Sequence, residues 1–158
     1  MLIARAAVRA ARAGDVEALG WALDRGLPVD ARNERGDSLL MLASYNGHRE
    51  AVRLLLARGA DPELANERGQ LPLAGAAFRG DVAMAELLLD GGARIDGCGA
   101  DGRTALLYAA MFDRLEMIAM LLGRGADPTH ADAAGLTALA LARMMGAARA
   151  TARLSLQS

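Results

Sequence analysis

The chain has 158 residues, of which 53% are apolar and 23% are charged, and its net charge at pH 7 is −1. A chain of this length can bury roughly two-thirds of its unfolded surface. It has no continuous apolar run of the ~18 residues that a membrane-spanning helix needs. The near-zero net charge argues against binding to nucleic acid or an anionic membrane, because both need a clustered basic face. We therefore expect one soluble, cytoplasmic domain, residues 1–158, that is monomeric when free.

The basic residues and the single cysteine give two further indications. All 18 basic residues are arginine, and together with the abundant alanine this is typical of a GC-rich bacterial genome. Cys98 is the only cysteine, so no disulfide can form within the chain and a reducing compartment is permitted. It lies among glycines, where a small turn residue is the simplest interpretation and an accessible thiol is the alternative.

The first segment, MLIARAAVRAARAG, predicts an amphipathic helix. Its small apolar residues and its arginines fall on different helical faces: Ile3, Ala7 and Ala10 on one, and Arg5, Arg9 and Arg12 on another. A targeting peptide is the alternative, since the segment is arginine-rich and no acidic residue precedes Asp15. We favour a helix that caps the amino-terminal end of the fold, because it explains both faces at once.

Glycines recur along the rest of the chain at an interval of 33 residues, in three registers. The members are Gly36, Gly69, Gly102 and Gly135; Gly26, Gly59, Gly92 and Gly125; and Gly14, Gly47 and Gly80, with Gly146 closing the series. A fixed period in this range indicates one supersecondary unit copied in tandem. Each copy buries its apolar face only by stacking on its neighbours.

Within one copy, residues 33–65, the apolar pattern predicts two short helices separated by Asn46-Gly47 and followed by a long polar turn. Aligning the copies gives one column of leucines and one of alanines: Leu40, Leu73, Leu106 and Leu139, and Ala43, Ala76, Ala109 and Ala142. Alanine suits a seam where two helices approach closely, and a larger side chain there would overpack it.

With this pattern, the chain resembles the ankyrin-repeat family over nearly every residue. The family's turn glycine, Thr-Pro-Leu-His-x-Ala-Ala, Gly-His, Leu-Leu and Gly-Ala-Asp are recognisable in GDSLLMLAS...GHREAVRLLLARGAD, GQLPLAGAA...GDVAMAELLLDGGA and GRTALLYAA...DRLEMIAMLLGRGAD. The resemblance implies an all-α solenoid of helix-turn-helix units joined by long β-turn-like loops. Residues 33–65, 66–98 and 99–131 would be full repeats, with 1–32 and 132–158 as terminal caps.

One departure from the family pattern and one from the inner repeats shape further expectations. The family's histidine is replaced by Met41, Ala74, Leu107 and Ala140, so its hydrogen bonds across repeats should be absent and packing should carry more of the rigidity. In the last unit, Thr151 and Ser155 stand where inner copies have apolar residues. Polar residues there would keep an end without a neighbour soluble.

The motifs that could carry catalysis or cofactor binding lack their required context. GCGADG at 97–102 satisfies G-x-G-x-x-G, but a dinucleotide site needs a preceding strand, and here a helix is expected. His48 and His130 belong to different repeats and have no metal-ligand spacing. We therefore predict no enzymatic activity, no cofactor and no metal. An enzyme or cofactor carrier is the alternative class, which a chromophore, a bound metal or turnover would reveal.

Helical geometry indicates where a partner would bind. A helix advances about 100° per residue, so if Leu40 faces the core, the side chain five positions later points away from it. This places an apolar row outside the core direction: Tyr45, Phe78, Met111 and Met144, flanked by Asn46, Arg79, Phe112 and Met145. Exposed apolar surface of this kind commonly marks a partner site. The alternative is that these side chains fill gaps between successive first helices.

The resemblance implies that the first helices and the long turns line a concave side, where ankyrin proteins typically bind. The turn-tip candidates are Glu34, Arg35, Asp37, Glu67, Arg68, Gln70, Asp101 and Arg103. We therefore predict a non-enzymatic module that binds another protein on this side. Alternatives are a dedicated inhibitor or immunity-type partner of one enzyme or toxin, or, by resemblance to small bacterial ankyrin proteins encoded beside catalases, an accessory to a redox enzyme such as catalase.

Overall fold

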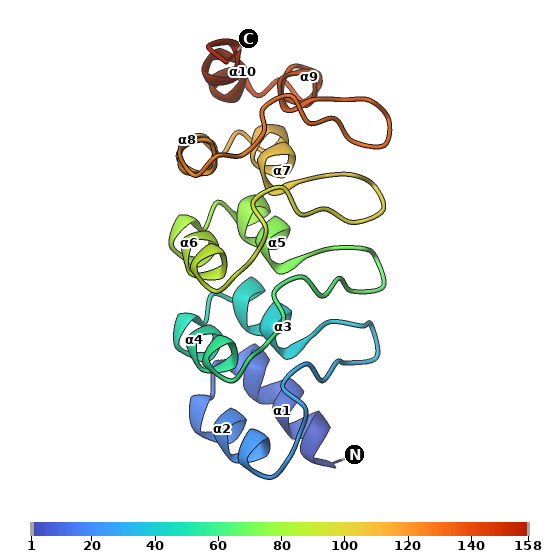
Figure 1. The fold of residues 1–158 in the computed structure, drawn as a ribbon, viewed down its shortest axis with the longest axis vertical. Helices are drawn as coiled ribbons and strands as arrows, with labels where there is room; N and C mark the ends of the chain where they lie inside the picture. Colours follow the sequence, from blue (N-terminus) through green and yellow to red (C-terminus); the bar gives the residue numbers. More distant parts are fainter. Residues whose placement is uncertain (1, 158) are drawn as a thin grey trace.

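The computed structural model describes residues 2–157, and within them the chain forms ten helices and no strand. The helices follow one another in five pairs (Figure 1): α1 (Leu2–Ala13) and α2 (Val16–Asp24), α3 (Leu39–Tyr45) and α4 (Arg49–Ala57), α5 (Pro72–Arg79) and α6 (Val82–Asp90), α7 (Ala105–Met111) and α8 (Leu115–Gly123), and α9 (Ala138–Met144) and α10 (Ala148–Ser155). The predicted all-α solenoid is confirmed. The unit boundaries stay a prediction, although each helix pair falls within one of the expected ranges.

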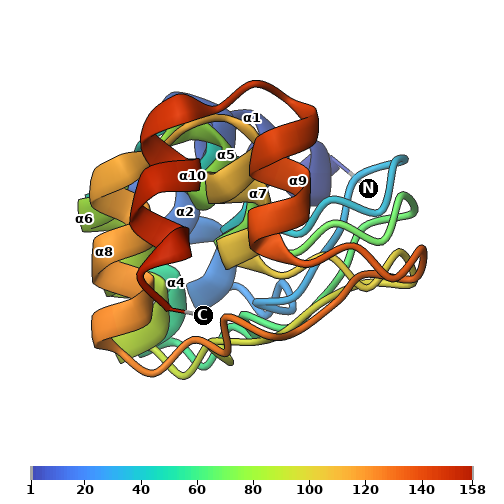
Figure 2. The ribbon, with the colours of Figure 1, turned by 90° about the horizontal axis from the view of Figure 1, so that it is seen from above.

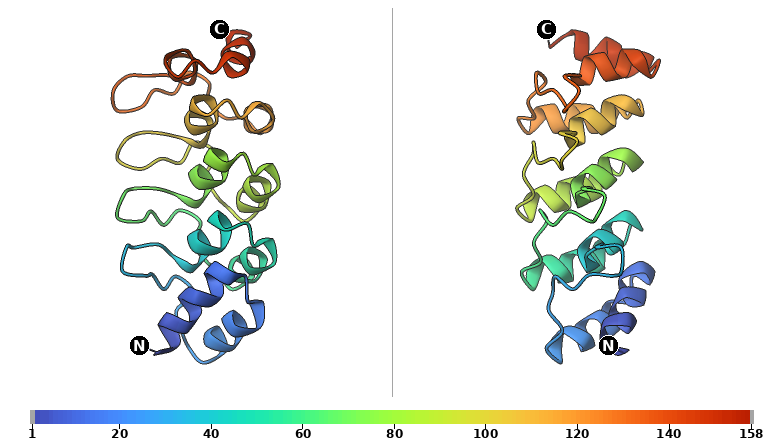
Figure 3. Two further views of the ribbon diagram at one scale, coloured as in Figure 1. Left: turned by 180° about the vertical axis from the view of Figure 1, so that it is seen from behind. Right: turned by 90° about the vertical axis from the view of Figure 1, so that its right-hand side faces the viewer.

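The pairs stack along one axis, with the two chain ends at opposite ends of the stack (Figures 1 and 3). The odd-numbered helices form one layer, in which α3 contacts α1 and α5, and α7 contacts α5 and α9. The even-numbered helices form a second layer, and the long loops project from the stack beside the odd-numbered helices (Figure 2). Within residues 2–157, no helix has the length and apolar character required to cross a membrane.

Short polar side chains begin half of the ten helices within residues 2–157 and satisfy one of the first unpaired N–H groups of each. The oxygens of five such residues accept a backbone N–H three positions later: Asp15, Ser38, Asp81, Thr104 and Thr137. Helix α5 begins instead with Pro72 in its first turn, where the missing N–H costs nothing. These caps help the five helices, each of only seven to nine residues, to form, because such short helices are marginal in isolation.

The turn between paired helices needs a left-handed residue, and four of the five pairs supply glycine. The third glycine register has φ between 69° and 80°, a region that glycine enters without steric cost. In the fourth pair the residue is Asp113, with φ of 57°. Its Oδ1 accepts the backbone N–H of Ala150 at 2.7 Å, in the first turn of α10. Asp113 therefore caps a helix of the next unit, and the only signal in the sequence is the missing glycine at this position.

The core runs the length of the stack between the two helix layers. Three members of the leucine column are buried, while Leu139 in the last pair is half-buried. All four members of the alanine column are buried, none more than 2% exposed, as expected of a close seam between helices. In α1, Ala7, Ala10 and Ala11 are buried and the arginines are exposed, so the predicted amphipathic helix is confirmed.

Hydrogen bonds between successive loops add to the packing. Asn66 Nδ2 donates to Asp37 Oδ1 at 2.9 Å, which joins the first two loops. Both histidines also connect units, because His48 Nε2 donates to the Arg12 carbonyl and His130 Nε2 to the Gly102 carbonyl, each at 2.8 Å. Packing was expected to carry more of the rigidity in place of the family histidine, and these polar contacts between neighbouring units add to it.

The glycine-rich segment 97–102 lies in the loop between α6 and α7, so a helix precedes it as expected. A Cβ atom on Gly99 would lie 1.9 Å from the carbonyl oxygen of Gly69. Only glycine allows the backbones of the two successive loops to approach this closely. The contact gives the segment a structural role in stacking the loops.

Candidate functional site

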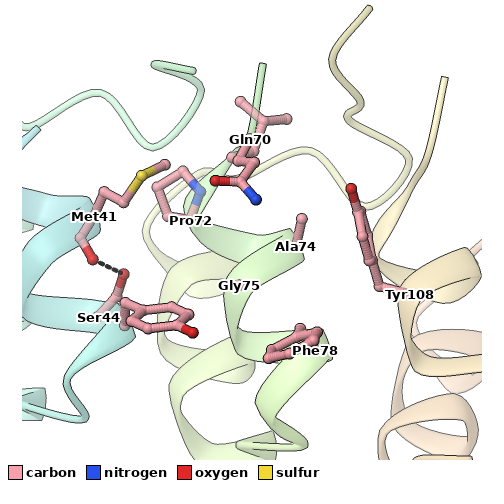
Figure 4. A pocket seen from close by; sticks show the side chains of 10 residues that line it. Met41, Ser44, Gln70, Pro72, Ala74, Gly75, Phe78 and Tyr108 are labelled. Atoms are coloured by element: carbon pink, nitrogen blue, oxygen red, sulfur yellow. Dashed lines mark hydrogen bonds between the residues drawn. The ribbon is translucent and has the colours of Figure 1, made fainter. Parts of the chain in front are cut away.

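A small hollow of about 130 Å³ lies on the odd-numbered layer between α3, α5 and α7 (Figure 4). Its rim is aromatic and its floor is formed by small side chains of α5. The lining residues are Met41, Ser44, Tyr45, Gln70, Leu71, Pro72, Ala74, Gly75, Phe78 and Tyr108. The hollow is therefore an apolar recess that three successive units build together.

The hollow exists because α5 carries small residues where its neighbours carry long ones. Ala74 occupies the position of Met41 in α3 and of Leu107 in α7, and Gly75 the position of Tyr108 in α7. A Cβ on Gly75 would approach the ring of Tyr45 to 3.3 Å. Figure 4 shows Ala74 and Gly75 between Met41 on one side and Tyr108 on the other. A side chain entering from outside can fill the space that α5 leaves open.

Two of the aromatic residues around the hollow, Tyr45 and Phe78, are exposed and also contact a neighbouring side chain. Tyr45 is 43% exposed, and the Arg79 guanidinium lies over its ring, 5.0 Å from the centroid. Phe78 is 37% exposed, and its ring meets that of Phe112 edge to face, with centroids 4.7 Å apart. Tyr45 and Phe78 of the predicted apolar row therefore make contacts between units and also leave apolar surface exposed.

Tyr108 is a lining residue that the sequence analysis missed. Its hydroxyl donates to Asp101 Oδ2 at 3.2 Å. Burial, followed by the neighbouring Asp101 carboxylate, raises the pKa of the Tyr108 phenol, so the hydroxyl stays protonated and keeps this hydrogen bond. The available signal was a tyrosine in a column that holds Leu42 and Leu141 in other units, but its direction toward the hollow depends on the small residues of α5.

Most of the predicted site residues lie on the exposed surface. The exposed members are Tyr45, Asn46, Phe78, Arg79, Phe112, Met144, Glu34, Arg35, Glu67, Arg68, Gln70 and Asp101. Met111 is half-buried and packs against the core. Asp37 and Arg103 are half-buried at the loops, where Asp37 accepts hydrogen bonds from Asn33 and Asn66. Met111, Asp37 and Arg103 thus also contribute to the packing or linking of units.

A wider groove adjoins the hollow and runs toward the amino-terminal end of the stack. It lies between α1, α3 and the first two long loops, and Met41, Tyr45 and Gln70 line both the hollow and the groove. The hollow and the groove therefore form one continuous surface. The predicted turn-tip residues of the first two loops also line this groove: Glu34, Arg35, Asp37, Glu67, Arg68 and Gln70.

The part of the chain that the structure describes holds no group of three or more His, Cys, Asp or Glu side chains arranged to bind a metal. Cys98 is exposed in the loop before α7. What the surface does offer is an apolar recess, aromatic side chains and charged loop tips. These are features that suit noncovalent recognition.

Comparisons with known proteins identify the repeating unit. The family described as ankyrin repeats (3 copies) matches residues 40–132 and 73–154, and that described as ankyrin repeats (many copies) matches residues 7–56. A Pseudomonas aeruginosa protein named as an ankyrin repeat protein is 59% identical over 38 residues, which make up 24% of this chain and 22% of that relative. The similarity to this relative thus covers less than a quarter of its length.

Proposed function

The chain belongs to the ankyrin-repeat family, and we propose that the surface formed by its odd-numbered helices and long loops binds a partner protein without catalysing a reaction. Ankyrin repeats are generally protein–protein interaction modules and are typically non-enzymatic. The observation that carries the proposal for this chain is the hollow beside Tyr45 and Phe78. One apolar side chain of the partner enters it, and the aromatic rim packs around that side chain.

The contacts of the rim favour binding because they fix the aromatic side chains before a partner arrives. Arg79 covers one face of Tyr45, and Phe112 meets Phe78 edge to face. Side chains that are already ordered lose little conformational entropy on docking, so more of the contact free energy appears as affinity. Aromatic anchors next to a pocket commonly dominate the binding energy of an interface.

The first test uses peptides selected on the immobilised protein from a random displayed library. The dissociation constants of the selected peptides are then measured for the wild type and variants. We expect Tyr45→Ala and Phe78→Ala to weaken binding at least about tenfold, which is roughly 1.4 kcal/mol. Their urea unfolding midpoints should change little, because both side chains are more than a third exposed.

A filled hollow provides the sharper variant. Ala74→Leu places in α5 the residue that α7 already carries at Leu107, and it should weaken binding by occupying the space that the partner needs. The matched control is Ala140→Leu, the same substitution at the equivalent position of α9, which does not line the hollow. Arg53→Ala on α4 is a second control. Neither control should change the dissociation constant.

Two outcomes would contradict the proposed binding surface. If Tyr45→Ala and Phe78→Ala lower the unfolding midpoint sharply but bind the selected peptides normally once folded, the aromatic row serves packing between units. Binding that survives Ala74→Leu would likewise remove the hollow as the anchor. The site would then move to the exposed loop tips, of which Arg35 and Arg68 would be the next residues to replace.

A further inference from the structure

Arginines from three separate segments gather along the groove at the amino-terminal end of the stack. They come from α1, from the first long loop and from the second: Arg5, Arg9 and Arg12, then Arg32 and Arg35, then Arg68. The carboxylates on the same lining are Glu34, Asp37 and Glu67. With six cations against three anions, the lining carries a net positive charge, although the whole chain has a net charge of −1. We call this surface the arginine groove.

The arginines of the groove are not paired with its carboxylates. None of its six arginines forms an ion pair with another residue in the described range 2–157. On the even-numbered layer, by contrast, Arg58 reaches Asp24 and Arg124 reaches Asp90, each at 2.8 Å. The groove carboxylate Asp37 already accepts two amide hydrogen bonds, one from Asn33 and one from Asn66.

Among the three arginines of α1, only Arg12, in the last turn, has a favourable interaction with the helix dipole. Arg5, Arg9 and Arg12 are exposed, and α1 contains no acidic residue. Like charges four and three positions apart on a helix destabilise it slightly, and a cation in the first turn is also unfavourable to the helix dipole. Carboxylates of a partner would supply the missing charges, and a guanidinium can hold a carboxylate by two parallel hydrogen bonds.

The shape of the first unit places these charges beside the hollow. Helix α1 has 12 residues, whereas the other odd-numbered helices have seven or eight. Its amino-terminal end lies on the side from which the long loops project (Figures 1 and 3). Met41 and Tyr45 line both the hollow and the arginine groove, so one extended segment can contact both.

We infer that the arginine groove binds an acidic, extended segment of the partner protein, whose apolar side chain enters the hollow. The inference rests on the proposed function and specifies the chemistry of the partner. A protein segment fits better than a nucleic acid, because apolar Leu2, Val8 and Leu42 also line the groove and the adjoining hollow suits an apolar side chain. Charges at such a site act on association rate and specificity, and salt screens them.

The test measures fluorescence anisotropy with two labelled ten-residue peptides. The acidic probe consists of Asp and Glu around a central Phe, and the amide probe has Asn and Gln at the same positions. The full chain should bind the acidic probe at least about tenfold more tightly at low salt, and about 0.5 M NaCl should remove most of this difference, because the Debye length falls to roughly 4 Å.

The variant Arg5→Gln/Arg9→Gln/Arg12→Gln should abolish the preference for the acidic probe. Glutamine keeps the helix propensity of arginine, and only the backbone carbonyl of Arg12 contacts His48, so α1 should still form. The control removes the same charge elsewhere, by replacing three arginines that do not line the arginine groove: Arg49, Arg94 and Arg153, each changed to Gln. This control should retain the preference, and circular dichroism serves to check that both variants fold.

Three results would overturn the inference. The first is equal affinity for the two probes, and the second is a preference for the acidic probe that survives the α1 substitutions. The third is that a ten-nucleotide oligouridylate binds more tightly than the acidic probe and that the α1 substitutions abolish its binding. Ala74→Leu reports on the proposed function separately. If Ala74→Leu weakens the binding of both probes and the wild type prefers neither, the hollow is an anchor and the inference of an acidic segment is wrong. If Ala74→Leu changes neither affinity while the preference for the acidic probe persists, the acidic segment in the arginine groove is supported and the anchor in the hollow is wrong.

Discussion

Ala109→Leu tests the seam between the odd-numbered helices. Ala109 is fully buried on α7, which packs against α5 on one side and α9 on the other. Leucine adds three carbon atoms, and if the site could accommodate them their burial would stabilise the fold by about 0.8 kcal/mol each. A close-packed interior has no such room, so strain should outweigh burial. We expect a net loss of about 1–3 kcal/mol.

The same substitution at Ala74 provides the comparison. Ala74 is buried too, but it faces the hollow of about 130 Å³, and the equivalent positions hold Met41 and Leu107. The added atoms can therefore enter open space, where partial burial offsets the lost rotamer entropy. We expect the free energy of unfolding of Ala74→Leu to stay within about 1 kcal/mol of the wild type.

Urea unfolding followed by circular dichroism measures both variants against the wild type. The midpoint should fall for Ala109→Leu and stay nearly constant for Ala74→Leu, with similar slopes for all three proteins. In a thermal scan, each 1 kcal/mol corresponds to about 2–4 °C for a chain of this size. An unchanged or raised midpoint for Ala109→Leu would refute the assignment of the alanine column to a close seam. Equal losses in the two variants would show that the hollow is not open.

Three further positions test polar and glycine contacts within the loops and between units. The pKa of Asp132 is lowered, chiefly by the backbone N–H of Leu136. The stability that the carboxylate contributes is therefore complete above the unfolded pKa of about 3.9 and is lost as the pH falls through the lower folded pKa. The difference in urea midpoint between wild type and Asp132→Ala should shrink only in acid below about pH 4, and a constant difference would contradict this. Asp113→Ala should lose about 1 kcal/mol more free energy of unfolding than Asp113→Gly. Both variants lose the hydrogen bond to α10, but only alanine has a strained φ. Equal losses would mean that this backbone angle does not strain alanine. Gly99→Ala should lower the urea midpoint, because the added Cβ would clash with a carbonyl of the preceding loop. The control Gly123→Ala should leave the midpoint unchanged, since no atom lies within 4 Å of its added Cβ. Similar midpoints for the two variants would show that the loops adjust freely.

The sequence by itself determined the repeating fold. The 33-residue interval, the turn glycines and the buried columns predict helix pairs stacked in order, and α1 follows from the separation of its alanines and arginines. This succeeds because each unit contacts mainly its neighbours. The direction of each core side chain is then set within a few turns of helix, where spacing along the chain is a direct measure of geometry.

Only the tertiary structure decided the details of the surface. The hollow needs Ala74 and Gly75 in one unit, Tyr45 in the unit before and Tyr108 in the unit after, and a single helical period does not describe that combination. Met111 leans into the core whereas Phe78 stays exposed, because the lateral direction of a side chain depends on how far adjacent units are offset.

The arginine groove and the cap at Asp113 have the same origin. A net charge of −1 argued against a basic face, yet stacking brings arginines of α1 beside those of two loops, the farthest being Arg68. Asp113 caps α10 by accepting the backbone N–H of Ala150, 37 positions later in the chain. Composition averages over the whole chain, whereas charge density and hydrogen bonding depend on which units lie side by side, and packing between units decides that arrangement.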